Sequence, residues 1–173
     1  MTGRPGVLRL VAGLCLLGLT AGAAEPSKAE TDAFGFAQGL YVHRDFRSAI
    51  EEFRACLKTY PDSARAADAR YRLADSLFQE GEFAEACTAY TDALARHPDH
   101  PEAARGLYNL GRSHHRLGQF DPALAAFRRA AAAGNEQVAV EAAVGIGESL
   151  ARLQRYPEAV ECYTAFLAAH PAN

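Results

Sequence analysis

Residues 105–130, RGLYNLGRSHHRLGQFDPALAAFRRA, show most clearly the pattern on which this chain is built. The apolar residues of this stretch recur three and four positions apart on either side of Gly118, which is the spacing of two amphipathic helices joined by a tight turn. Asp121 can cap a helix and Pro122 is tolerated in a first turn, so this dipeptide marks the start of the second helix.

The crossing of these two helices is expected to combine small residues with one large ring. Gly111 and Ala123 are small because the helices must approach closely there, and Phe127 fills the space beside them. The stretch therefore predicts a compact helix–turn–helix unit with Phe127 in its core.

This unit occurs four times in register. The alanines of the second helices, Ala49, Ala86, Ala123 and Ala159, are 37, 37 and 36 residues apart. The other matching residues are Ala37, Leu40, Phe46, Phe53, Cys56 and Pro61 in the first copy, Ala74, Leu77, Gly81, Phe83, Tyr90, Ala93 and Pro98 in the second, and Gly147, Leu150, Tyr156, Tyr163, Phe166 and Pro171 in the last.

The repeated pattern of small residues, aromatic rings and alanines resembles the tetratricopeptide repeat (TPR). The chain departs from that family in three ways: it has no Trp, Asn135 stands where Pro is usual, and Phe166 stands where Ala is usual. The spacing also exceeds the standard repeat of about 34 residues. Longer repeats of this kind are common in TPR proteins of the bacterial envelope.

The resemblance implies an all-α, right-handed α-solenoid of about four helix pairs. Its copies are expected at roughly 30–63, 67–100, 104–137 and 140–173. In such an array each pair buries its apolar faces against its neighbours, so stability is roughly a sum over adjacent interfaces.

Residues 1–23 have the features of a secretory signal peptide. Arg4 and Arg9 precede the apolar run 10–19, which is far shorter than the roughly 20 residues that span a bilayer. Cleavage is expected after Ala23, an uncleaved anchor being the alternative, and residues 24–29 are expected to form a linker. The mature protein is then periplasmic or secreted and not inserted in the membrane.

The charge of the chain is mildly acidic. Its formal net charge is −3, and the predicted signal peptide carries two arginines and no acidic residue. A general nucleic-acid-binding protein would carry a concentrated basic face, so no nucleic-acid partner is expected.

No catalytic, metal or cofactor site is predicted. The three cysteines after the signal peptide are expected as isolated core residues of second helices, and the pair His97 and His100 has no further ligand nearby, whereas zinc sites use three or four. Residues 147–151, GESLA, have the form of a nucleophile elbow, but that motif needs a strand before the serine and this serine lies in a predicted helix. The chain is therefore expected not to be an enzyme and to need no cofactor.

The resemblance places ligand binding on the concave face, which is lined by the first helices. Three consecutive copies put an aromatic at one inward position and a ring seven residues later, and the third copy adds arginines. Phe34 and the other rings of the first position are as well explained by core packing. The predicted partner-binding groove comprises Tyr41, Tyr71, Phe78, Tyr108, Arg112, His115 and Arg116.

Charges on the same face suggest how a partner is held. Arg112 and Arg116 could pair with a carboxylate of a peptide, although a solvated helix face explains them equally well. Acidic residues of the neighbouring copies, among them Asp75 and Glu148, flank this basic patch. The Lys/Asn clamp of cytosolic chaperone adaptors does not match, because Asn109 lacks the accompanying lysines.

The sequence thus predicts an exported, non-catalytic module that binds a peptide segment of an envelope protein. It is similar to the TPR components of bacterial envelope machines, namely the Tol-Pal-associated and outer-membrane assembly types. Alternatives are a spacer or N-terminal scaffold domain of a larger protein, or an accessory subunit that presents an envelope hydrolase. The last helix carries Val160, Tyr163, Phe166 and Leu167 on one stripe, which calls for more chain, a partner or a second copy.

Overall fold

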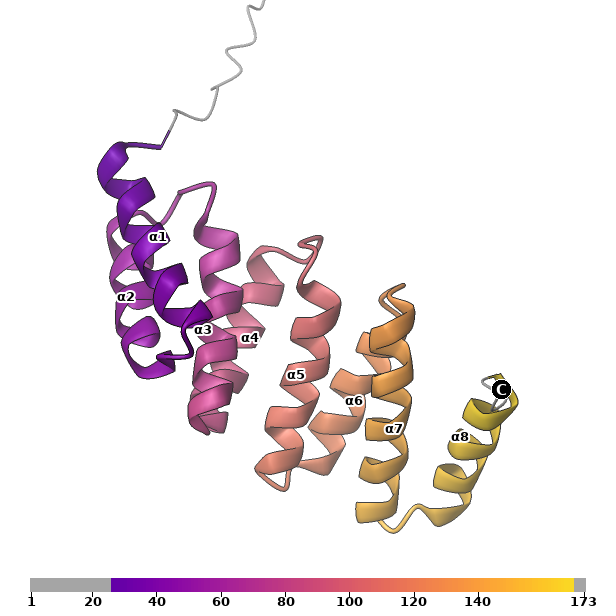
Figure 1. The fold of residues 1–173 in the computed structure, drawn as a ribbon. Helices are drawn as coiled ribbons and strands as arrows, with labels where there is room; N and C mark the ends of the chain where they lie inside the picture. Colours follow the sequence, from indigo (N-terminus) through magenta and orange to yellow (C-terminus); the bar gives the residue numbers. More distant parts are fainter. Residues whose placement is uncertain (1–25, 170–173) are drawn as a thin grey trace, which may run out of the picture.

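A computed structural model describes residues 26–169, so the predicted signal peptide and its cleavage site lie outside the described residues. This part of the chain forms eight helices and no strand (Figure 1). The pairs are α1 (Lys28–Val42) with α2 (Phe46–Thr59), α3 (Ala66–Glu80) with α4 (Phe83–Arg96), α5 (Ala103–Arg116) with α6 (Phe120–Ala131), and α7 (Glu136–Arg152) with α8 (Tyr156–Ala169). The predicted all-α solenoid is confirmed.

The pairs stack in chain order, and the two faces of the stack differ. Each helix packs on the next one in the chain, and α1, α3, α5 and α7 also contact one another in sequence. The second helices α2, α4, α6 and α8 make no comparable contact with each other. Because the first helices are closer together, they line the inner side of the curve.

Helix ends follow local chemistry, with two differences from expectation. Ser27 accepts the N–H of Glu30, so α1 begins at Lys28, inside the expected linker. The helix α6 begins at Phe120 after Gln119, which makes no side-chain cap. Asp121 therefore does not cap α6 as expected; it lies in the first turn, where a negative charge favours the helix dipole.

The turn inside each pair needs one left-handed residue, at the same place in every repeat. Gly81 and Gly118 supply it in the two middle pairs, with φ of 84° and 73°. Arg44 and Gln154 adopt the same conformation in the outer pairs, with φ of 63° and 60°. The outer turns thus accept a strain that glycine avoids in the middle ones.

The ring of Phe127 lies at a close approach of two helix pairs in the core. A Cβ added to Gly111 would come within 2.7 Å of the Phe127 ring, and one added to Gly145 within 2.8 Å. The ring is therefore held between two glycines, one on α5 and one on α7. This confirms the predicted close crossing and extends it to the next pair.

None of the helices between residues 26 and 169 has the length and hydrophobicity needed to cross a bilayer.

Candidate functional site: the inner face

One ring near the C-terminal end of each of the helices α1, α3 and α5 packs in the same way. This ring stands edge-on against the first residue of the second helix of its own pair. The centroid distances are 5.7 Å for Tyr41 and Phe46, 5.5 Å for Phe78 and Phe83, and 5.2 Å for His115 and Phe120. Interplanar angles of 67–69° make all three edge-to-face pairs, which aromatic rings prefer.

Two rings predicted to face a partner lie in the core instead. Tyr71 is 1% exposed, and its hydroxyl donates to the carbonyl oxygen of His97 at 3.0 Å. Phe78 is 7% exposed because Arg112 of the next pair covers it. Spacing placed both rings on the inner side of their helix, but helices that approach each other closely leave no room for a free ring.

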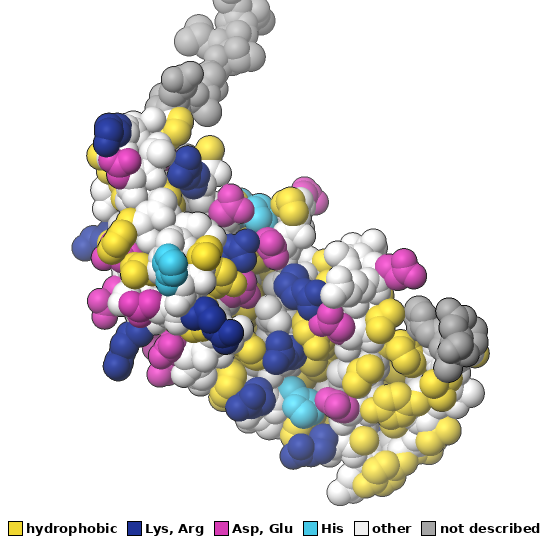
Figure 2. All heavy atoms as spheres, in the orientation of Figure 1, with side chains coloured by type: hydrophobic (Ala, Val, Ile, Leu, Met, Phe, Trp, Pro, Cys, Tyr) yellow, Lys and Arg dark blue, Asp and Glu magenta, His cyan; other side chains and the backbone are white. Residues whose placement is uncertain are grey.

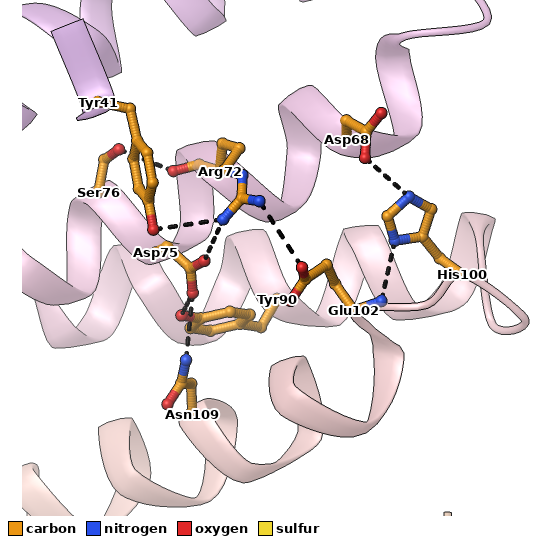
Figure 3. A network of polar contacts seen from close by, with 9 residues as sticks. All are labelled: Tyr41, Asp68, Arg72, Asp75, Ser76, Tyr90, His100, Glu102 and Asn109. Atoms are coloured by element: carbon orange, nitrogen blue, oxygen red, sulfur yellow. Dashed lines mark hydrogen bonds and ion pairs between the residues drawn. The ribbon is translucent and has the colours of Figure 1, made fainter. Parts of the chain in front are cut away.

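A polar network fills the inner face between the first three pairs (Figure 3). Asp75 accepts hydrogen bonds from the hydroxyl of Tyr90 at 2.5 Å and from the amide of Asn109 at 3.1 Å. Arg72 lies 3.9 Å from the same carboxylate and stands 4.9 Å above the ring of Tyr41. The network ties α1, α3, α4 and α5 together, so Asp75 is a structural residue here.

Burial raises the pKa of the Asp75 carboxyl, and the hydrogen bonds from Tyr90 and Asn109 oppose that rise. Tyr41 is half-buried, and burial likewise raises its pKa. Hydrogen bonds from Tyr90 and Asn109 hold Asp75, and one from Arg72 holds the hydroxyl of Tyr41.

His100 lies beside this network, between Asp68 and Glu102 (Figure 3). Its ring stacks on Tyr71 with centroids 4.8 Å apart, and one nitrogen lies 3.1 Å from an oxygen of Asp68. The other nitrogen accepts the backbone N–H of Glu102 at 3.2 Å, which leaves the first nitrogen to donate to Asp68. Burial raises the pKa of the Tyr71 hydroxyl to about 12.

A hollow of about 360 Å³ opens on the inner face between α5 and α7. It brings together four of the seven predicted groove residues. Phe127 and Gly145 form its floor, and its remaining lining residues are Tyr108, Arg112, His115, Arg116, Glu141, Val144 and Glu148.

The two arginines of the hollow lie on rings of the preceding pair. The guanidinium carbon of Arg112 is 4.5 Å from the centroid of Phe78, and that of Arg116 is 4.6 Å from the centroid of Phe83. Arg152, one repeat after Arg116, lies 4.5 Å above Phe120 in the same way. A guanidinium placed over a ring can still present N–H groups that match the two oxygens of a carboxylate.

None of these three arginines forms an ion pair with a carboxylate of residues 26–169. By contrast Arg105, on the same helix, pairs with Glu141 at 2.5 Å. The hollow thus has a basic wall on α5, with its charges unpaired in the described chain, and Glu148 on the opposite wall.

Hydrophobic side chains lie beside this basic wall on the same face. Figure 2 shows arginines and histidine over α5 and a hydrophobic patch over α7 and α8. Val144 lines the hollow and is 41% exposed, and Tyr163 of α8 lies against Gly147. The inner face therefore offers charge and apolar surface next to each other.

In residues 26–169 no three side chains of His, Cys, Asp or Glu converge as metal ligands would. Cys56, Cys87 and Cys162 are free thiols in the same part of the chain. They belong to second helices, which do not contact one another.

Two family models described as tetratricopeptide repeat match residues 65–136 and 108–173. Together they cover well over half of the chain. The chain is a tetratricopeptide repeat protein. Proteins of this family are in general interaction modules for protein or peptide partners. A comparison with curated proteins found no match.

Solved structures show the same fold at low identity. MamA from Desulfovibrio magneticus is 19% identical with a TM-score of 0.69, over 83% of this chain and 78% of that one. A TPR protein from Parabacteroides merdae is 20% identical with a TM-score of 0.73, over 85% and 56%. A Rap protein complexed with competence and sporulation factor is 23% identical with a TM-score of 0.61, over 82% and 43%.

Reasoning from the sequence missed what makes the hollow. Phe83 lies under Arg116 of the hollow, as Phe120 lies under Arg152 one repeat later, and Gly145 keeps a side chain from filling the floor. The repeat register contains a signal for the first two, since each ring stands 33 or 32 residues before the arginine that stacks on it. No local signal distinguishes Gly145 from any other small helix residue.

Proposed function

We propose that this TPR protein is an exported, non-catalytic adaptor that binds an acidic peptide segment of another envelope protein in the hollow between α5 and α7. The observation that carries the proposal is the pair of stacked arginines, Arg112 and Arg116, without acidic partners in the described chain. A charge that stabilises the fold is normally paired, as Arg105 is with Glu141.

The surroundings of the arginines support a peptide rather than a polyanion. Glu148 faces them across the hollow and would repel a run of phosphates. A peptide can place one carboxylate on α5, a backbone N–H on Glu148, and an apolar side chain against Tyr108 and Val144.

Two further features are consistent with this proposal. The Rap protein of the same fold was solved in complex with another factor, so the fold can hold a partner. Residues 1–23 have the composition of a secretory leader. A spacer or an accessory subunit for a hydrolase would not require unpaired arginines in a hollow.

Peptide binding is tested with two labelled peptides of Ser and Leu, about ten residues long, one with a single central Glu and one with a single central Lys. We expect the acidic peptide to bind more tightly in fluorescence anisotropy. Arg112→Gln and Arg116→Gln should each weaken binding about tenfold, which is about 1.4 kcal/mol. Arg129→Gln on α6, exposed and outside the hollow, is the matched control and should leave affinity unchanged.

Equal affinity for both peptides, or no effect of the two arginine changes, would remove the hollow from the proposal. Export is tested separately, by mass spectrometry of the protein released from the periplasm. A chain beginning at Ala24 is expected, and a chain that keeps residues 1–23 would contradict it.

A second copy of the chain is the other partner that the sequence suggested. The exposed side chains of Val160, Tyr163 and Leu167 on α8 support such an association, which would be separate from peptide binding in the hollow.

A further inference from the structure

The joints between helix pairs are built from the same repeat positions each time. Ile50 of α2 lies in one core cluster with Leu73 of α3, and Leu124 of α6 lies in one cluster with Ile146 of α7. Ile50 and Leu124 are equivalent residues of the second helix, and Leu73 and Ile146 are equivalent residues of the first. Each of these two joints therefore includes an apolar residue at the same repeat position on each side.

The last pair exposes its half of this joint. Val160 of α8 is the equivalent of Ile50 and Leu124, which are 7% and 4% exposed, yet it is 63% exposed. Leu167 is 65% exposed, whereas its equivalent Leu94 is 8% exposed. The same side of α8 thus has the chemistry of an internal joint without a cover in the described chain.

The first pair exposes the complementary half. Phe36 of α1 is the equivalent of Leu73, Leu110 and Ile146, and it is 59% exposed where Leu110 is 6% exposed. One turn further along α1, Gly39 has no atom near its Cβ direction, whereas its equivalents Ser76, Ser113 and Ser149 are fully buried. Cys87 of α4, the equivalent of Val160, packs against the core cluster that contains Leu110 of α5, so the joint between these two helices uses the same two positions.

We propose that α8 of one copy docks on α1 of a second copy, so that Val160 meets Phe36 and Gly39 and the array continues from chain to chain. The two halves lie at opposite ends of the solenoid (Figure 1), so one chain cannot join them itself. Burying these side chains uses the same hydrophobic gain that holds the internal pairs together.

The alternative of two α8 helices meeting would pair second helix with second helix, a contact that no internal joint of the array uses. Docking of α8 on α1 is a heterologous contact, which does not close on itself and grows with concentration. It is independent of peptide binding in the hollow.

The test is sedimentation velocity of the chain from Ala24, with the full-length chain in parallel, over a hundredfold range of concentration. The wild type should form species whose mass rises with concentration. Phe36→Asp and Val160→Asp should each raise the dissociation constant at least tenfold and remain monomeric alone. An equal mixture should form dimers and nothing larger, because one variant keeps α8 intact and the other keeps α1 intact.

Val42→Asp is the matched control, since Val42 is an exposed apolar residue of α1 at the position that faces the groove in later repeats. It should associate like the wild type, and so should Arg112→Gln. Circular dichroism of each variant checks that the helices are retained.

Three results would overturn the proposal: a wild type that stays monomeric, a mixture of the two variants that stays monomeric, or Phe36→Asp that still dimerises alone. The last result would mean that two α8 helices pair with each other. Loss of peptide binding with association intact would overturn only the function proposed for the hollow.

Discussion

Asp75 of α3 and Arg112 of α5 stand at the same place in consecutive repeats, 37 residues apart, and the molecule uses them differently. Asp75 is largely buried and bonded to Tyr90 and Asn109, with Arg72 beside it. Arg112 is exposed, stacked on Phe78, and has no acidic partner in the described chain. A repeat register therefore assigns a residue to the inner face without saying whether it joins the pairs or meets a ligand.

The difference comes from the neighbours of each residue. Around Asp75, the next pair supplies a donor from Asn109, so the inner face is filled. Around Arg112, the next pair supplies Gly145, Val144 and Glu148, which leave a hollow. Substitutions at Phe127, Asp75 and Arg112 separate the filled part of the inner face from the hollow.

Phe127→Ala should lower the free energy of unfolding by about 3–5 kcal/mol, the usual cost of truncating a buried phenylalanine. The ring forms the floor of the hollow and is held between Gly111 and Gly145. Chemical denaturation measures the loss. A change near zero would mean that the floor is not core and that the hollow is misplaced.

Asp75→Ala should cost about 1–3 kcal/mol, because the hydroxyl of Tyr90 and the amide of Asn109 then lose their acceptor inside the array. Denaturation in parallel with Glu148→Ala gives the control, since Glu148 is an exposed acid at the same repeat position. Equal losses for the two changes would mean that the surroundings of Asp75 are no more tightly bonded than those of Glu148 in the hollow.

Asp75→Asn should change how the free energy of unfolding depends on pH, and this change should be smaller than the loss caused by Asp75→Ala. The ordinary pKa is 3.8, and burial raises the pKa of the folded carboxyl above it. The folded state then binds more protons, so this group's contribution is fully present below pH 3.8 and is lost as the pH rises through the folded pKa. Unfolding measured from pH 4 upward should show the wild type losing stability relative to the Asn variant. A parallel pair of curves would contradict a raised pKa.

Arg112→Gln should change stability least, by less than about 1 kcal/mol, because an exposed cation–π contact contributes little. Its effect should appear in peptide affinity instead. If thermal denaturation showed a loss as large as that of Asp75→Ala, Arg112 would belong to the joint between pairs rather than to a binding surface.

Most of the fold could be predicted from the sequence because each repeat is defined by local spacing. Gly81 and Gly118 mark turns, and residues such as Ala123 and Phe127 mark the crossing, since only small residues beside one ring allow close approach. The same information placed Tyr108, Arg112, His115 and Arg116 on one face, where they do meet in the hollow.

The sequence failed where the answer depends on the gap between pairs. Tyr71 was expected to reach a partner, but α5 approaches so closely at Gly106 that an added Cβ would lie 2.8 Å from the Tyr71 ring. Asp75 was expected to flank the basic patch of the groove, yet Tyr90 and Asn109 come from two other helices to bond it. Such partners lie 15 and 34 residues away, beyond any local pattern.

Periodicity within about 37 residues is enough to give four helix pairs, their register and the side of each helix that faces inward. The packing of the pairs against one another sets which inward residues are buried, which arginines lie on rings without an acidic partner in the described chain, and where a hollow opens. The physical reason is that burial and pairing depend on the distance between helices, and that distance is set by side chains from different repeats.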